Sequence, residues 1–168
     1  MNYKNFKSLS ILFLIMLISF SFYAESKPKE PNKKSKEYFQ IAIDTLQKAT
    51  LDNIEVRKKI ALKYLKKSIS ADNNNVQAYM WSVMILIDQK KYKNALSEIK
   101  KGIKRSKANN SVLLPQLYMS KGGLHLLMNN KSKARNAYKS AISEFNKILK
   151  EDKCNAEAIA NIPIIFAM

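Results

Sequence analysis

Apolar residues recur at helical spacing along most of this chain, and the pattern predicts α-helices that pack in pairs. In the stretch KARNAYKSAISEF, one helical face is small or apolar, and Lys, Arg, Asn, Ser and Glu occupy the other. A face with small side chains lets a second helix approach closely, so this helix is predicted to pack against others. The residues on that face are Ala134, Ala137, Tyr138, Ala141, Ile142 and Phe145.

The same pattern occurs three times, in IALKYLKKSI, NALSEIKKGI and KARNAYKSAI. Each copy has Ala, a large apolar residue four positions on, a small residue three further on, and then Ile. The alanines are Ala61, Ala95 and Ala134, which stand 34 and 39 residues apart. A second helical pattern that opens with Tyr precedes each copy. Internal repetition of this length predicts a row of helical hairpins.

This pattern resembles the tetratricopeptide repeat (TPR) family, whose unit has about 34 residues. The opening tyrosines, the three alanines and the small residues of the second helices match the family, as does Gly122. Val83 to Ala95 and Gly122 to Ala134 are both 12 residues, as the family's tight turn between helices implies. The resemblance covers about Ser35 to Asn161. It implies an all-α fold, a right-handed α-solenoid of about three hairpins plus a partial C-terminal capping helix.

The chain departs from the family pattern in its first unit, before its third unit and at its end. Ala42 to Ala61 is 19 residues, seven more than in the other units, and seven residues make about two helical turns. Both helices of the first hairpin are therefore expected to be longer. Five extra residues lie in KANNSVLLP. CNAEAIANI is predicted to be the first helix of an incomplete fourth unit, which Pro163 should end or kink, and IIFAM then either folds back or forms a docking element.

The N-terminal residues predict export. Lys4 and Lys7 precede an apolar stretch from Leu9 to Tyr23, short for a membrane span, so residues 1–24 read as a signal peptide or an uncleaved N-terminal anchor. Residues 25–35 are rich in Lys and Pro and predict a disordered linker, and residues 36–168 form the repeat domain. The protein is expected to be extracytoplasmic, either periplasmic or secreted.

No set of polar residues predicts catalysis, a cofactor or a metal site. His125 is the only histidine and stands where the family places an aromatic residue, so it is read as a packing residue. Cys154 is the only cysteine, which excludes an internal disulfide but leaves a semi-buried residue or an intermolecular bond open. The chain is expected not to be an enzyme.

The TPR resemblance implies that the first helices line a concave groove for partner segments. The groove is Met-rich and apolar, which suits an apolar helix or extended segment, but the same residues could instead be core beneath the long first helix and the tail. The expected groove residues are Phe39, Ile43, Gln77, Met80, Met84, Ile87, Met119, Gly123 and Leu126.

The second helices are strongly basic in a chain of net charge +17, in which 27 of 30 basic residues are Lys. This face is either a solvated helix surface, biased by an AT-rich genome, or a site for anionic polymers, membrane or acidic partners. Nucleic acid is not expected, because no aromatic residues interleave the lysines. The face comprises Arg57, Lys58, Lys63, Lys66, Lys67, Lys100, Lys101, Lys104, Arg105, Lys133, Arg135 and Lys139.

Three functions follow as hypotheses. In the first, the protein is an adaptor or scaffold of the cell envelope whose groove holds an apolar segment of another protein. In the second, it is a structural protein whose basic face binds an anionic envelope polymer or membrane. An immunity or inhibitor protein would use the same surfaces. The sequence sets neither the partner nor the oligomeric state, because one repeat fold serves many tasks.

Overall fold

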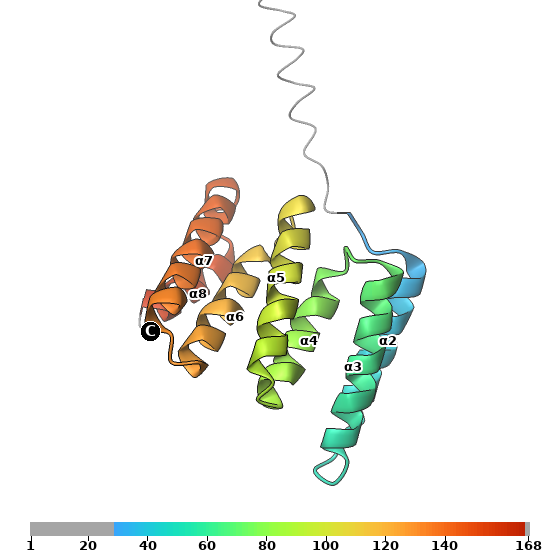
Figure 1. Cartoon of the computed structure of the whole chain (residues 1–168). Helices are drawn as coiled ribbons and strands as arrows, with labels where there is room; N and C mark the ends of the chain where they lie inside the picture. The colour runs from blue at the N-terminus through green and yellow to red at the C-terminus, as the bar shows by residue number, and fades with distance from the viewer. Residues whose placement is uncertain (1–28, 167–168) are drawn as a thin grey trace, which may run out of the picture.

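Residues 29–166 of the computed structural model fold into a row of α-helices, and this part of the chain contains no strand (Figure 1). The predicted signal peptide and the first four residues of the predicted linker lie outside the described residues. The helices are α2 (Lys33–Gln47), α3 (Ile54–Ala71), α4 (Val76–Asp88), α5 (Tyr92–Ala108), α6 (Leu114–Leu127), α7 (Lys131–Glu151) and α8 (Ala156–Phe166).

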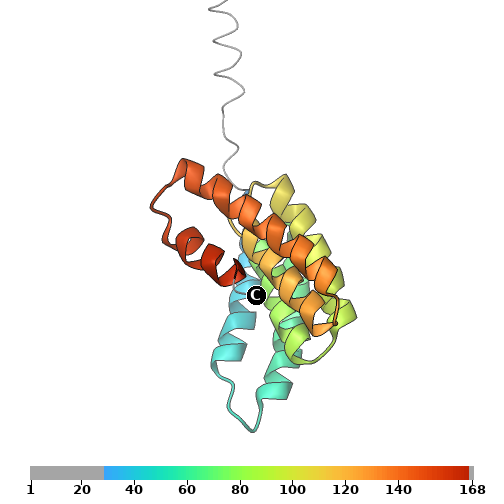
Figure 2. The same ribbon diagram turned by 90° about the vertical axis from the view of Figure 1, so that its left-hand side faces the viewer.

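The helices form three antiparallel hairpins, α2–α3, α4–α5 and α6–α7, followed by α8. Packing is most extensive within the hairpins, and each hairpin also packs on the next element in the sequence. Figures 1 and 2 show two layers, with α2, α4, α6 and α8 in one and α3, α5 and α7 in the other. Nearest-neighbour stacking of this kind defines a helical solenoid. The predicted all-α helical-repeat fold is confirmed.

The hydrophobic core is divided into three clusters along the row. Each cluster joins the two helices of one hairpin to the first helix of the next unit. Leu62 and Ile103 lie between successive clusters and contact both. No hairpin therefore buries its apolar face alone, which explains why the third hairpin needs α8 after it.

The repeated residues of the second helices lie in these clusters as the pattern predicts. Ala61 and Ala95 are fully buried, Ala134 is nearly so, and the small residues that follow them are buried too. Gly102 shows why the small residues matter: a Cβ there would lie 3.1 Å from Tyr79 Cβ and 3.2 Å from a Leu117 methyl group. The helices of neighbouring units thus pack with almost no space between them.

The first hairpin accommodates its seven extra residues differently from the expectation that both helices lengthen. Helix α2 ends five residues after Ala42, just as α4 ends five residues after Val83. Instead, α3 begins seven residues before Ala61, where α5 begins three before Ala95, and the connection has six residues in place of three. One additional helical turn and a longer loop absorb the insertion, because the start of α3 extends beyond the packed part of the row.

The predicted linker ends earlier than expected, because α2 begins at Lys33. Asn32 caps the helix by accepting a 2.8 Å hydrogen bond from Ser35 N. Asn32 also donates from its backbone N to Asp72 Oδ2 (2.9 Å) and from Nδ2 to Ala71 O (2.7 Å). These bonds fix the last residues of the predicted linker to the end of α3.

Helix α8 is the predicted first helix of a fourth unit, but Pro163 does not end it. Asn155 caps the helix through a 3.1 Å bond from Ala158 N, and the helix runs on to Phe166. Ala158 and Ile165 are buried in the last core cluster beside Leu114 and Tyr118. Of the C-terminal segment IIFAM, Ile165 packs onto the last hairpin, as the alternative in which the segment folds back predicts.

Candidate functional site

The nine expected groove residues all belong to the first-helix layer, and none of them is fully buried. Met84 is 55% exposed and Leu126 39% exposed, whereas Phe39, Ile87 and Met119 are half-buried against the core clusters. The alternative in which long helices or the tail cover these residues therefore does not hold for the described part of the chain. Helices α2, α4 and α6 present apolar side chains that solvent reaches.

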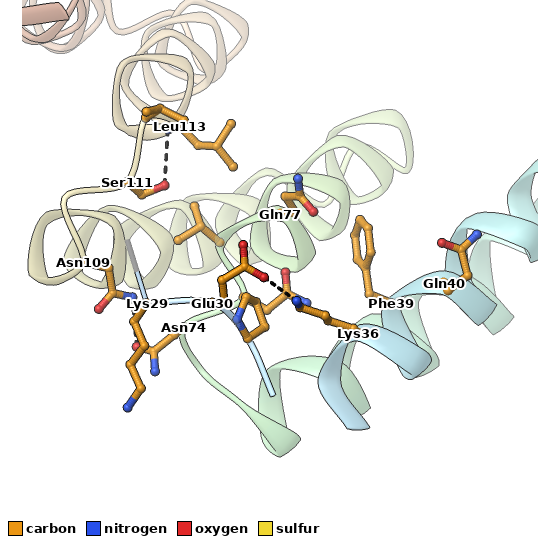
Figure 3. Close-up of a pocket in the computed structure, with 14 residues that line it drawn as sticks. Lys29, Glu30, Lys36, Phe39, Gln40, Asn74, Gln77, Asn109, Ser111 and Leu113 are labelled. Carbon is orange, nitrogen blue, oxygen red and sulfur yellow. Dashed lines mark hydrogen bonds and ion pairs between the residues drawn. The ribbon is translucent and has the colours of Figure 1, made fainter. Parts of the chain in front are cut away.

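A pocket of about 500 Å³ lies at the end of this layer, where α2, α4 and α6 begin (Figure 3). Two expected groove residues, Phe39 and Gln77, line it. The other seven lie elsewhere on the three helices. The pocket is also lined by Lys29, Glu30, Pro31, Lys36, Gln40, Asn74, Asn75, Val76, Asn109, Ser111, Val112 and Leu113.

The walls of the pocket combine amide groups with apolar side chains. Asn109 Nδ2 donates to Asn74 Oδ1 over 2.9 Å, which joins the α3–α4 turn to the α5–α6 turn. Lys36 forms an ion pair with Glu30 across the pocket, and this contact lowers the pKa of the Glu30 carboxyl below its usual value. Amides both donate and accept hydrogen bonds, so the pocket offers partners to a polypeptide backbone as well as apolar contacts.

A buried hydrogen-bond network holds the floor of this region in place. The Ser35 and Ser68 hydroxyls lie 2.9 Å apart, and each also donates to the other residue's backbone carbonyl oxygen. Asn75 Nδ2 donates to Ser68 Oγ (3.0 Å) and to Ser35 Oγ (3.2 Å), while its Oδ1 caps α4. All three side chains are at most 2% exposed. The network fixes the starts of α2 and α4 relative to each other.

Half of the pocket residues outside the expected groove come from the turns between hairpins. Neither the Asn-rich turn after α3 nor KANNSVLLP was expected to line a site. Their side chains meet because the two turns adjoin in the stack. Only the repeat register, which places both turns at the same end of the row, could have indicated this from the sequence.

The expected basic face is mostly exposed, but several of its members have partners. Lys58 contacts Asp88 and Glu55, and these bonds raise the pKa of its ammonium group. Glu98 pairs with Lys101 at 2.8 Å and raises its pKa in the same way. Lys67 Nζ lies over the rings of Tyr38 and Tyr64, 5.5 and 5.0 Å from their centroids. The face is thus a mixture of solvated and engaged charges.

The residues that could carry chemistry do not converge. His125 is buried, as a packing residue should be, and its pKa is lowered by burial first and then by Lys121, Lys133 and Lys100. Cys154 is exposed. Within residues 29–166, no three His, Cys, Asp or Glu side chains are placed to hold a metal ion together. No helix in that range has the length and hydropathy to cross a bilayer.

One solved structure with a similar fold is the N-terminal domain of stress-induced protein-1 (STI-1) from C. elegans. The TM-score is 0.60 at 14% sequence identity, and the match covers 80% of this chain and 98% of that domain. At this identity the likeness is one of fold alone. No family model and no curated protein matches the chain.

Proposed function

We propose that this chain is a protein-interaction module of the TPR type that holds an apolar segment of another protein along α2, α4 and α6. The observation that carries the proposal is the accessibility of the first-helix layer: Met84 is 55% exposed and Leu126 39% exposed in a region otherwise packed by core residues. Large apolar side chains left in solvent on one face are typical of a binding surface.

The chemistry of the layer indicates what the bound segment is like. Met80, Met84 and Met119 are unbranched and polarizable, so they adapt to apolar side chains of different shapes. At the end of the layer, the amides of the 500 Å³ pocket suit the peptide groups of an extended backbone. An apolar segment whose end continues as an extended chain fits both parts.

Substitution of Met84 by Lys tests the groove. Because Met84 is more than half exposed, Met84→Lys should change thermal unfolding little, yet it places a charge where the partner's apolar side chains would lie. Ile60→Lys is the matched control, since Ile60 is 38% exposed on α3, in the other layer, and gains the same charge. The measurement is capture of partner proteins from an envelope extract at low and high salt.

A defined partner that survives high salt, is lost with Met84→Lys and is retained with Ile60→Lys supports the groove. Apolar contacts hold or strengthen as ionic strength rises, whereas attraction between charges is screened. Equal capture by wild-type protein and Met84→Lys would refute the proposal, and a large loss of stability in Met84→Lys would place that side chain in the core instead.

We further propose that the module works in the cell envelope. The support lies in the sequence, where a basic start and a 15-residue apolar stretch precede the domain. Fractionation of cells that produce the tagged chain tests this, and recovery of the protein in the cytoplasm at full length would refute it.

A second candidate function is attachment of the basic second-helix face to an anionic envelope polymer or membrane. The observation in its favour is that most of the face is exposed and that Lys63, Lys66 and Lys104 make no ion pair within residues 29–166. Capture that disappears at high salt and ignores Met84→Lys would favour this function.

A further inference from the structure

The three turns within the hairpins lie along one edge of the row, opposite the edge at which α2, α4 and α6 begin (Figure 1). We define the turn edge as the last residue of each first helix, the turn, and the first three residues of the second helix. The turn edge comprises residues 47–56, 88–94 and 127–133. It is distinct from the 500 Å³ pocket, which lies where the first helices begin.

The turn edge is rich in exposed lysine. None of its six lysines forms an ion pair within the described residues, and Lys91 donates only to the neutral Gln89 side chain, over 2.8 Å. Of its three carboxylates, Glu55 and Asp88 are engaged by Lys58, which leaves Asp52. The six lysines are Lys48, Lys90, Lys91, Lys93, Lys131 and Lys133, all of them exposed.

Apolar side chains stand among these charges. Leu51 is 96% exposed at the tip of the long first hairpin, Val56 is 58% exposed beside it, and Leu127 is 54% exposed at the end of α6. Nothing in the fold requires a leucine at a tip that solvent surrounds almost completely. A single exposed apolar side chain is common on a protein surface, but these three lie on the edge that also carries the six lysines, and this mixture of basic and apolar side chains suits a membrane interface.

Charge and apolar surface also meet in one place. An open pocket of about 410 Å³ is lined by Lys90, Lys91 and Lys93, by Tyr92 and Asn94, and by Met128, which directly follows α6. A ligand there would bring an anionic group against the ammonium groups and an apolar group against the methionine, and phospholipids carry both.

We propose that the turn edge docks on the surface of a bilayer that contains anionic phospholipid. Lysines near such a surface are attracted by the headgroups, and exposed Leu, Val and Met side chains gain by entering the interface. A soluble polyanion would use the lysines but would leave Leu51, Val56 and Leu127 in water. The proposal is independent of the groove, because α2, α4 and α6 remain open when the turn edge is bound.

A fluorescent probe at the turn edge provides the test, because the full chain retains the apolar stretch Leu9–Tyr23, which can enter vesicles by itself. In a Cys154→Ser background, Ser132→Cys places one environment-sensitive fluorophore at the turn edge. Ser143→Cys is the matched control: it is also an exposed serine of α7, 11 residues further on and roughly 16 Å away along the helix.

Vesicles of equal parts phosphatidylcholine and phosphatidylglycerol should shift the emission of the probe at position 132 to shorter wavelength and leave the probe at 143 unchanged. Vesicles of phosphatidylcholine alone should give little shift at either position. Replacing Lys90, Lys91 and Lys93 by Gln should lower the ratio of docked to undocked probe about 100-fold. This expectation assumes that the loss of each lysine lowers the ratio by roughly tenfold or less.

Three results would overturn the proposal. Equal shifts at positions 132 and 143 would mean that the fluorophores report non-specific adsorption. An unchanged signal in the triple Lys variant would remove the role of the pocket. A response to soluble polyphosphate that vesicles do not reproduce would assign the lysines to an anionic polymer instead.

Discussion

The first and third hairpins follow the same repeat pattern but are held together in different ways. In α2–α3, the helices are joined at one end by the buried hydroxyls of Ser35 and Ser68, which no other hairpin has among the described residues. In α6–α7, the helices are joined by close packing, because Gly122 lies directly under the ring of Tyr138. A shared pattern thus fixes the architecture and leaves the means of attachment to particular residues.

The comparison extends to the sizes of the facing residues. The first hairpin sets Ala42 in a core cluster with Leu65, and the third sets Gly122 against the larger Tyr138. Of these two pairs, the one with the smaller residue on the first helix therefore has the larger residue on the second helix. Close-packed interiors require this compensation, since an added atom has no space to enter.

Substitution of the two adjacent glycines of α6 should give the largest effect. A Cβ at Gly122 would lie 2.5 Å from Tyr138 Cε1, whereas one at Gly123 would approach only Tyr138 Oη, at 3.8 Å. Gly122→Ala should lower the free energy of unfolding by about 2 kcal/mol, the cost of overpacking less the gain of alanine in a helix. Gly123→Ala should raise it by up to about 1 kcal/mol. Urea denaturation measures both.

The double variant Gly122→Ala with Tyr138→Leu sharpens the same test. If the Tyr138 ring is the obstacle, its removal should make Gly122→Ala harmless when compared with Tyr138→Leu alone. An unchanged penalty in that background would mean that the backbone of α7, and not the ring, sets the distance between the helices.

The turns Asp72–Asn75 and Asp152–Asn155 test the polar attachment of the first hairpin. In both turns the first Asp accepts from the backbone two residues on, and the final Asn caps the following helix. Only Asn75 also donates to two buried serines. Asn155→Ala should cost about 1 kcal/mol, the value of a cap, and Asn75→Ala should cost about 1 kcal/mol more. Equal losses would mean that the network adds nothing to the cap.

Helical periodicity and the repeat together predicted the hairpins, the buried alanines and the extra helix at the C-terminus. These features depend on residues close in sequence and on one repeated contact, so the pattern contains them. The sequence did not predict that the first insertion divides into one helical turn and a longer loop. Apolar residues keep helical spacing from Leu46 to Ile54, so the pattern does not show that the helix is interrupted between them. Pro163 was expected to end or kink the last helix, but it does not end α8, because continuation of the helix buries Ile165 in the last core cluster.

The candidate site could be predicted only in part. The TPR resemblance implied the groove residues, and they all lie in the first-helix layer with none fully buried; that a partner binds there stays a prediction. The 500 Å³ pocket depends on Asn74 of one turn meeting Asn109 of another, 35 residues later. Side-chain contacts between turns of different units depend on the angle between units, which a single sequence does not encode locally.

Protonation of His125 should destabilise the third hairpin more than the first. Burial and the nearby Lys121, Lys133 and Lys100 lower the pKa of His125 below its ordinary value near 6.5. The unfolded chain therefore binds the proton more readily, so the His125 contribution to stability is complete above about pH 6.5 and declines as the pH falls below it. Thermal unfolding between pH 8 and pH 5 should show this decline, and His125→Phe should reduce it. A parallel decline in the variant would assign the pH dependence to other groups.

The smallest expected effect concerns the turns that follow α4, α5 and α6, where three of the described residues adopt positive φ. Two are asparagines, Asn110 (φ 48°) and Asn129 (φ 56°), but the third is Lys90, at φ 57°. Asparagine tolerates this conformation better than lysine does, and glycine adopts it without cost. Lys90→Gly should therefore raise the free energy of unfolding by about 0.5 kcal/mol, and Asn129→Gly by less. If the turn edge docks on anionic membranes, Lys90→Gly should also weaken vesicle docking while Asn129→Gly leaves it unchanged. A stabilised Lys90→Gly variant with undiminished docking would mean that the lysine contributes strain without function at this turn.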